Sequence, residues 1–249
     1  MGWTLARGGN LCWGGFMTRS RADSLRWMAE GTTLLLGALQ AVPDAQLSDP
    51  CALPGWSGKH LVAHVALNAE ALMNLASWAR TGVETPMYSS PTQREDDIER
   101  EAKLPVAELR DRLVETAVAL DASLAGLSES QWDRPIRTRQ GREVTGEEIP
   151  WMRSREVMVH AVDLAASVGF ADLPADFLAS LIDDIAAKRD GEGLVLVATD
   201  QDRRWTIPGE PAGEVHGTVA GLAAYLSGRE TSDVAGAGGR LVPRLGPWL

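Results

Sequence analysis

The chain has 249 residues, of which 45% are hydrophobic and 23% charged, as in an ordinary soluble globular protein. Its formal net charge of -10 at pH 7 argues against binding to nucleic acid or to anionic membranes, because both need clustered Lys and Arg. The two cysteines, Cys12 and Cys51, are too few for a disulfide scaffold. We therefore expect a cytoplasmic protein whose chemistry, if it uses a thiol, takes that thiol from outside the chain.

Four long helical patterns come first along the chain. They cover residues 20–40, 57–80, 106–127 and 146–168. Ser57 is a suitable N-cap for the second helix and Gly82 a suitable end, while Pro150 falls near the start of the fourth, where proline is tolerated. A loop and a charged stretch, 94–103, separate the second helix from the third. The pattern predicts an up-and-down four-helix bundle.

The pattern changes after the fourth helix. A helix over 174–189 is followed by an apolar, β-branched run at 194–197, which indicates a strand. Its expected hairpin partner, a further strand and a short helix cover 203–207, 214–219 and 221–226. This half of the chain predicts a small α+β unit.

These patterns divide the chain into three parts. Residues 1–16 make a poor signal peptide and are expected to be a disordered N-terminal extension, with Met17 as the natural first residue. Residues 17–170 form the expected metal-binding bundle and residues 171–249 the small C-terminal α+β domain. The expected fold class is therefore mainly α, with a smaller α+β domain.

Three side chains in the bundle suggest a metal site. Glu156 and His160 are four residues apart, so they share one face of a helix and can chelate one ion. His64 lies in an apolar stretch of the second helix, where an unpartnered imidazole would be costly. Two histidines and one glutamate would leave an open coordination position, as catalytic zinc sites do.

Spacing alone leaves other interpretations open. A Glu–His pair at this spacing is more often a surface ion pair than a chelate, and a single buried His64 is more often a hydrogen-bonded core residue. His60, one turn before His64, is a rival ligand. Arg229 follows the last helix, where it would either complement the helix dipole or bind an anion.

The chain resembles the mycothiol-dependent maleylpyruvate isomerases, within the wider DinB-like family of metal-binding bundles. The resemblance rests on residues 60–69, on the Thr-Pro-Met-Tyr loop in 81–88 and on residues 151–164, and it extends over nearly everything after Met17. It ends on a final Trp-Leu, 248–249. The family implies zinc held by His64, Glu156 and His160 rather than by His60, and an essential arginine at Arg229.

The resemblance also implies a reaction. Maleylpyruvate would be isomerised to fumarylpyruvate, in the gentisate pathway of aromatic catabolism, by addition of a zinc-activated mycothiol thiolate, bond rotation and elimination. The expected cofactors are zinc and mycothiol, and the expected state is a monomer without nucleic-acid or membrane partners. Two alternatives remain: a mycothiol S-transferase acting on another electrophile, and a non-enzymatic metal-binding module.

Overall fold

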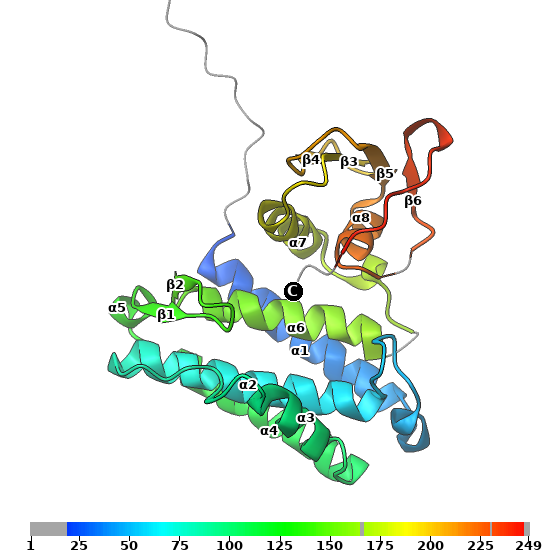
Figure 1. The fold of residues 1–249 in the computed structure, drawn as a ribbon. Helices are drawn as coiled ribbons and strands as arrows, with labels where there is room; N and C mark the ends of the chain where they lie inside the picture. Colours follow the sequence, from blue (N-terminus) through cyan, green and yellow to red (C-terminus); the bar gives the residue numbers. More distant parts are fainter. Residues whose placement is uncertain (1–18, 165–166, 230, 247–249) are drawn as a thin grey trace, which may run out of the picture.

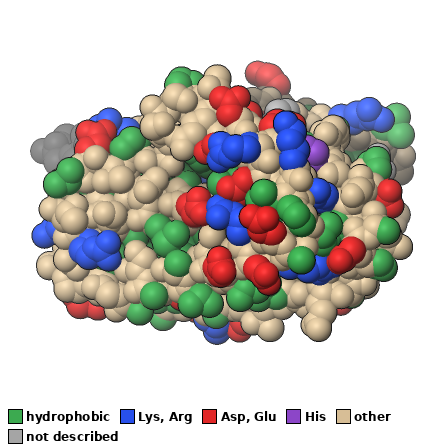
Figure 2. Space-filling view, turned by 90° about the horizontal axis from the view of Figure 1, so that it is seen from below, with side chains coloured by type: hydrophobic (Ala, Val, Ile, Leu, Met, Phe, Trp, Pro, Cys, Tyr) green, Lys and Arg blue, Asp and Glu red, His purple; other side chains and the backbone are tan. Residues whose placement is uncertain are grey.

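The computed structural model describes residues 19–164, 167–229 and 231–246. The expected extension over 1–16, the proposed start at Met17 and the terminal Trp-Leu at 248–249 lie outside the described residues. Among the described helices, none is both long and apolar enough to span a membrane. On the face drawn in Figure 2, acidic and basic side chains are interspersed and form no broad basic patch.

The expected four-helix bundle is confirmed. Its helices are α1 (Arg21–Ala41), α2 (Gly58–Thr81), α4 (Val106–Ala125) and α6 (Glu148–Leu164). Helix α1 packs mainly against α6, and α2 packs against both α4 and α6 (Figure 1). Most buried side chains of α2 are Leu, Val or Ala, so a single apolar helix can contact two neighbours.

Contacts between helix ends fix the direction of each helix. Arg19, just before α1, donates to Glu148 at the start of α6 at 2.6 Å, so these two helices run the same way. Arg110, near the start of α4, donates to the carbonyl of Leu39 at the end of α1 at 2.6 Å. The first turn of α2 also lies against the connection after α1, where a Cβ on Gly58 would be 3.2 Å from Leu47 Cα. The four helices therefore run up, down, down and up, so the alternating up-and-down order that the sequence pattern predicted is wrong.

The connection between α2 and α4 makes this order possible. It carries the chain back along the bundle and includes α3 (Gln93–Glu101), a helix that the sequence analysis left as a charged stretch. Only Ile98 and Glu101 of α3 are buried, so the segment has no apolar stripe to reveal a helix. Arg112 on α4 anchors α3 through a 2.8 Å contact with Glu101.

A second connection joins α4 to α6. It contains α5 (Glu129–Trp132) and an antiparallel hairpin of β1 (Pro135–Arg137) and β2 (Glu143–Thr145). The expected N-cap at Ser57 is present, and α2 ends at Gly82, whose φ of 77° is the left-handed conformation that favours glycine.

The C-terminal unit has the expected α+β composition. It contains α7 (Ala175–Lys188), β3 (Leu194–Ala198), β4 (Arg204–Thr206), β5 (Gly213–Gly217), α8 (Val219–Leu226) and β6 (Val234–Gly236). The sheet order is β4-β3-β5-β6, with β3 and β5 parallel and the other pairs antiparallel. The expected hairpin of β3 and β4 is confirmed, and β6 is a strand that sequence reasoning missed.

The C-terminal unit packs directly on the bundle. Helices α7 and α8 lie between the sheet and α6 (Figure 1). Phe177 of α7 lies 5.9 Å from Trp27 of α1 and 5.7 Å from Trp151 of α6, measured between ring centroids. All three rings belong to one apolar cluster that continues into β3 and α8. This shared core holds the end of α8 close to α6.

Two glycines of α1 provide a test of the close packing between α1 and α6. A Cβ at buried Gly31 would lie 2.6 Å from Val157 Cγ2 and 2.9 Å from Met158 Cγ, whereas one at exposed Gly37 would meet nothing within 4 Å. We predict that Gly31→Ala lowers the free energy of unfolding by about 1–3 kcal/mol through overpacking. Gly37→Ala should raise it by ~0.5–1 kcal/mol. Urea denaturation measures both, and equal stability of the two variants would contradict the close approach.

Candidate metal centre and active site

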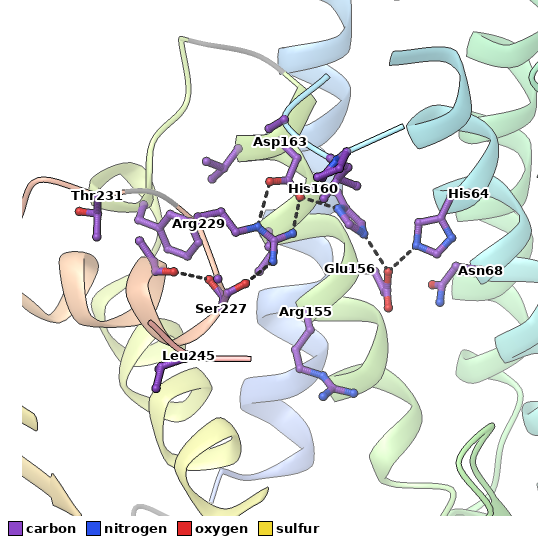
Figure 3. Close-up of a pocket in the computed structure, with 18 of the residues that line it drawn as sticks. His64, Asn68, Arg155, Glu156, His160, Asp163, Ser227, Arg229, Thr231 and Leu245 are labelled. Atoms are coloured by element: carbon purple, nitrogen blue, oxygen red, sulfur yellow. Dashed lines mark hydrogen bonds and ion pairs between the residues drawn. The ribbon is translucent and has the colours of Figure 1, made fainter. Parts of the chain in front are cut away.

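The three predicted ligands lie together between α2 and α6. His64 Nε2 is 2.9 Å from Glu156 Oε2, and His160 Nε2 is 3.2 Å from the same oxygen (Figure 3). One potential ligand atom from each residue lies within 4.8 Å of the others. Two imidazoles and one carboxylate at this separation could hold a metal ion, and the donor set is one that zinc accepts.

Burial and charge act differently on the three groups. Burial lowers the pKa of His64 to about 4, so this imidazole is neutral, as a metal ligand must be. Burial opposes ionisation of Glu156 too, but hydrogen bonds from His160 and His64 hold its pKa well below the ordinary range. The carboxylate is therefore charged, and 21% of its side-chain surface is open.

His60, the rival ligand, has another role. Its Nδ1 lies 3.2 Å from the backbone nitrogen of Ser57 and 2.7 Å from the Ser57 hydroxyl, which completes a capping box at the start of α2. Its Nε2 lies 3.6 Å from Glu99 on α3. Among the described residues, the group that could hold a metal contains His64 and does not contain His60.

Asp163 connects the cluster to Arg229. Its Oδ2 lies 2.8 Å from His160 Nδ1, and its side chain is only 1% exposed. Arg229 Nε donates to Asp163 Oδ1 at 3.0 Å, and Nη2 donates to Oδ2 at 2.5 Å (Figure 3). Although burial opposes ionisation, His160 and Arg229 lower the pKa of Asp163. The arginine also caps the end of α8, since Nη1 donates to the Ser227 carbonyl at 2.7 Å. The helix-capping interpretation of Arg229 therefore has a structural counterpart, whereas binding of a ligand anion stays a prediction.

A large cavity opens beside these residues. Its volume is about 1290 Å³, and its wall comes from α2, α6, α8 and the loops around them. The wall includes His64, Glu156, His160, Asp163 and Arg229. It also carries side chains to which the sequence analysis assigned no role: Asn68, Tyr88, Arg94 and Arg139.

Several of these residues had a weak signal in the sequence. Asn68 is one turn after His64, and Asp163 is three residues after His160, so both positions follow from helical periodicity once the ligands are known. Arg94 reaches the site from α3, the helix that was not predicted, and its Nη2 lies 3.4 Å from His64 Nδ1. Nothing local marks that residue as part of the site.

Two arginines of α6 next to Glu156, Arg153 and Arg155, are buried. Arg155 lines the cavity and pairs with Asp184 of α7 at 3.0 Å. Arg153 donates to Val65 O at 2.7 Å and to Asn68 Oδ1 at 2.9 Å, inside the contact between α2 and α6.

The fold and this cluster define a class: a four-helix bundle with a C-terminal α+β unit and a potential metal centre. A family model described as the mycothiol maleylpyruvate isomerase N-terminal domain matches residues 28–165. The chain belongs to this isomerase family, as the extent of that match and the structural likeness below both show.

Two of the similar solved structures agree with that assignment. The crystal structure of the mycothiol-dependent maleylpyruvate isomerase is similar with a TM-score of 0.87 and 37% identity, over 92% of this chain and 98% of that one. A histidine-to-alanine mutant of that enzyme gives the same values. YfiT from Bacillus subtilis, described as a probable metal-dependent hydrolase, is 20% identical over 64% of this chain and 94% of its own, with a TM-score of 0.48. No curated protein matches significantly.

Metal content distinguishes the two histidines of α2. We predict about one zinc per chain in the purified protein, measured by mass spectrometry of the metal. His64→Ala and Glu156→Gln should lose it because each removes one of three ligands, whereas His60→Ala should retain it. Since His60→Ala removes part of a helix cap, circular dichroism should accompany the measurement. Loss of zinc from a folded His60→Ala protein, with retention by His64→Ala, would reverse the assignment.

Proposed function

We propose that this protein catalyses the mycothiol-dependent isomerisation of maleylpyruvate to fumarylpyruvate in the gentisate pathway. The observation that carries the proposal is the meeting of the His64–Glu156–His160 cluster and Arg229 at one cavity, through Asp163. The likeness to a mycothiol-dependent maleylpyruvate isomerase over 92% of the chain supports the same reaction. We also propose that the enzyme acts as a cytoplasmic monomer.

The three clustered residues would hold zinc. Asp163 accepts a hydrogen bond from His160 Nδ1, which leaves His160 Nε2 available as a ligand, an arrangement common around zinc-bound histidines. Zinc held by three protein ligands keeps an open position, and there it would stabilise the thiolate of mycothiol near neutral pH. Asp163 would thus fix the orientation of one ligand.

Arg229 would bind the substrate's negative charge. Its three hydrogen bonds to Asp163 and Ser227 use three of the five N–H donors of a guanidinium, so two remain for a carboxylate or a developing enolate oxygen. Residues 17–170 would then supply the metal ligands and residues 171–249 this cation. With a boundary near residue 171, the proposed site would lie between the two parts of the chain.

The reaction requires a temporary loss of the substrate's double bond. The cis double bond of maleylpyruvate becomes single when sulfur adds to it, and the displaced electron pair moves to the conjugated carbonyl oxygen. The carbon–carbon bond can then rotate, and departure of sulfur restores the double bond in the trans geometry. The added sulfur leaves unchanged, so no oxidant or reductant is needed. The cavity of about 1290 Å³ exceeds the usual ~300–1,000 Å³ of a single small-ligand site, which suits a thiol cofactor and substrate together.

The decisive assay is turnover of maleylpyruvate with and without mycothiol. We expect fumarylpyruvate to form only when the thiol is present, as followed by absorbance and chromatography. Conversion of a generic electrophile, with no isomerisation of maleylpyruvate, would instead support a mycothiol S-transferase on the same scaffold. Isomerisation at the same rate without mycothiol would contradict the proposed role of the thiol.

Substitution of Arg229 tests its proposed role. We predict that Arg229→Ala lowers kcat/KM by about 100-fold or more, because the charge formed on the substrate loses its counterion. Zinc content should be unchanged, since Arg229 contacts none of the three proposed ligands directly. Arg229→Lys, which keeps the charge but not the fork of donors, should recover part of the activity. Full turnover by Arg229→Ala would leave this arginine with its helix-capping role alone.

A further inference from the structure

Arg153 is a buried cation with an unusual set of partners. Only 1% of its surface is exposed, and its Nη1 donates to Val65 O at 2.7 Å and to Asn68 Oδ1 at 2.9 Å. Its Nη2 is buried without a hydrogen-bond partner among the described residues. Removing a guanidinium from water costs free energy, and an apolar side chain of similar shape is often no worse for stability. The burial of Arg153 therefore calls for an explanation other than stability.

The contact with Arg153 determines which way the Asn68 amide points. A guanidinium has only donors, so the Asn68 atom that faces it must be the oxygen. The alternative amide rotamer would place the Asn68 NH2 group against Arg153 and set donor against donor. The contact with Arg153 therefore decides which end of the Asn68 amide is the oxygen and which is the nitrogen.

The Asn68 nitrogen is left without a partner beside the potential metal centre. Asn68 is 5% exposed and lines the cavity with His64 and Glu156. Figure 3 shows it on α2, one turn from His64 and on the side toward Glu156. Within residues 19–164, 167–229 and 231–246, its Nδ2 makes no hydrogen bond, yet it is not among the fully enclosed unpaired atoms. Its two N–H groups are thus available to a molecule in the cavity.

We propose that Asn68 donates a hydrogen bond from Nδ2 to an oxygen of the bound substrate, and that Arg153 is the positioning residue that orients this donor. The inference rests on the proposed function for the identity of the substrate. The oxygen is a carboxylate or carbonyl oxygen that carries more negative charge when sulfur adds to the double bond. An N–H donor that is already oriented stabilises such charge with little reorganisation.

Two variants of Asn68 separate the donor from other effects. Asn68→Asp keeps an oxygen acceptor for Arg153 and replaces the NH2 donor by a second oxygen. Asn68→Leu is similar in size and removes the donor without adding charge. We expect both to fold and to keep zinc, and both to lower kcat on maleylpyruvate about 100-fold, with a smaller change in KM. Activity within twofold of the original chain in a folded Asn68→Leu protein would overturn the proposal.

A binding measurement separates this inference from the proposed function. Fumarate, added without any thiol so that no reaction occurs, serves as a dicarboxylate probe for calorimetric titration of the zinc-loaded protein. The original chain should bind it at least tenfold more tightly than Asn68→Leu does. If this difference is found but maleylpyruvate is not isomerised, the donor role stands and the proposed reaction fails. If both proteins bind fumarate equally, the donor role fails even where the reaction is confirmed.

The role of Arg153 has its own readout. Arg153→Met removes the partner that orients Asn68 and should lower kcat and fumarate affinity by about tenfold, with thermal stability unchanged or increased. In the double variant with Asn68→Leu, the substitution at Arg153 should add no further loss, because the donor that it orients is already gone. An additive loss would show that Arg153 acts only through the general packing of α2 on α6.

Discussion

The buried negative charge of Glu156 is the constraint that the side chains between α2 and α6 must satisfy. It lies between α2 and α6, where an isolated negative charge would be expensive. The structure meets this cost with two imidazoles whose Nε2 atoms lie 2.9 and 3.2 Å from one carboxylate oxygen. Burial keeps His64 neutral, as a metal ligand must be, whereas Asp163 and Glu156 raise the pKa of His160 although burial opposes its charge. His64, Glu156 and His160 meet at one carboxylate oxygen, so a cation placed among them could be coordinated by all three.

The C-terminal unit completes the site because its helices share a core with the bundle. Phe177, Trp27 and Trp151 hold α7 on α1 and α6, and α8 follows in the same apolar cluster. The end of α8 then lies where Arg229 can reach Asp163. The packing of these apolar rings therefore holds Arg229 against Asp163, which in turn contacts the potential metal ligand His160. A bundle alone would supply the ligands but not the arginine.

The sequence predicted the parts of this structure that have a regular pattern. Helical periodicity located the four bundle helices, and β-branched residues located β3 and its hairpin partner. The charged stretch at 94–103 has no apolar stripe, so α3 and the approach of Arg94 to His64 could not be foreseen. Spacing also could not separate His60 from His64. The structure separates them because His60 Nδ1 contacts the backbone nitrogen and hydroxyl of Ser57 in the capping box at the start of α2. The burial of Arg153 could not be predicted because its hydrogen-bond acceptors lie on α2, far away in sequence.

Two polar side chains of the cavity wall, His160 and Asn68, are oriented by hydrogen bonds from neighbouring protein groups. His160 has Glu156 on one ring nitrogen and Asp163 on the other, so its orientation is fixed from both sides. Asn68 is fixed only through its oxygen, by Arg153, and its nitrogen is left for the cavity. Each of these side chains is held at one end by a protein group, His160 by Asp163 and Asn68 by Arg153, so the position of the nitrogen at its other end is determined before a ligand binds.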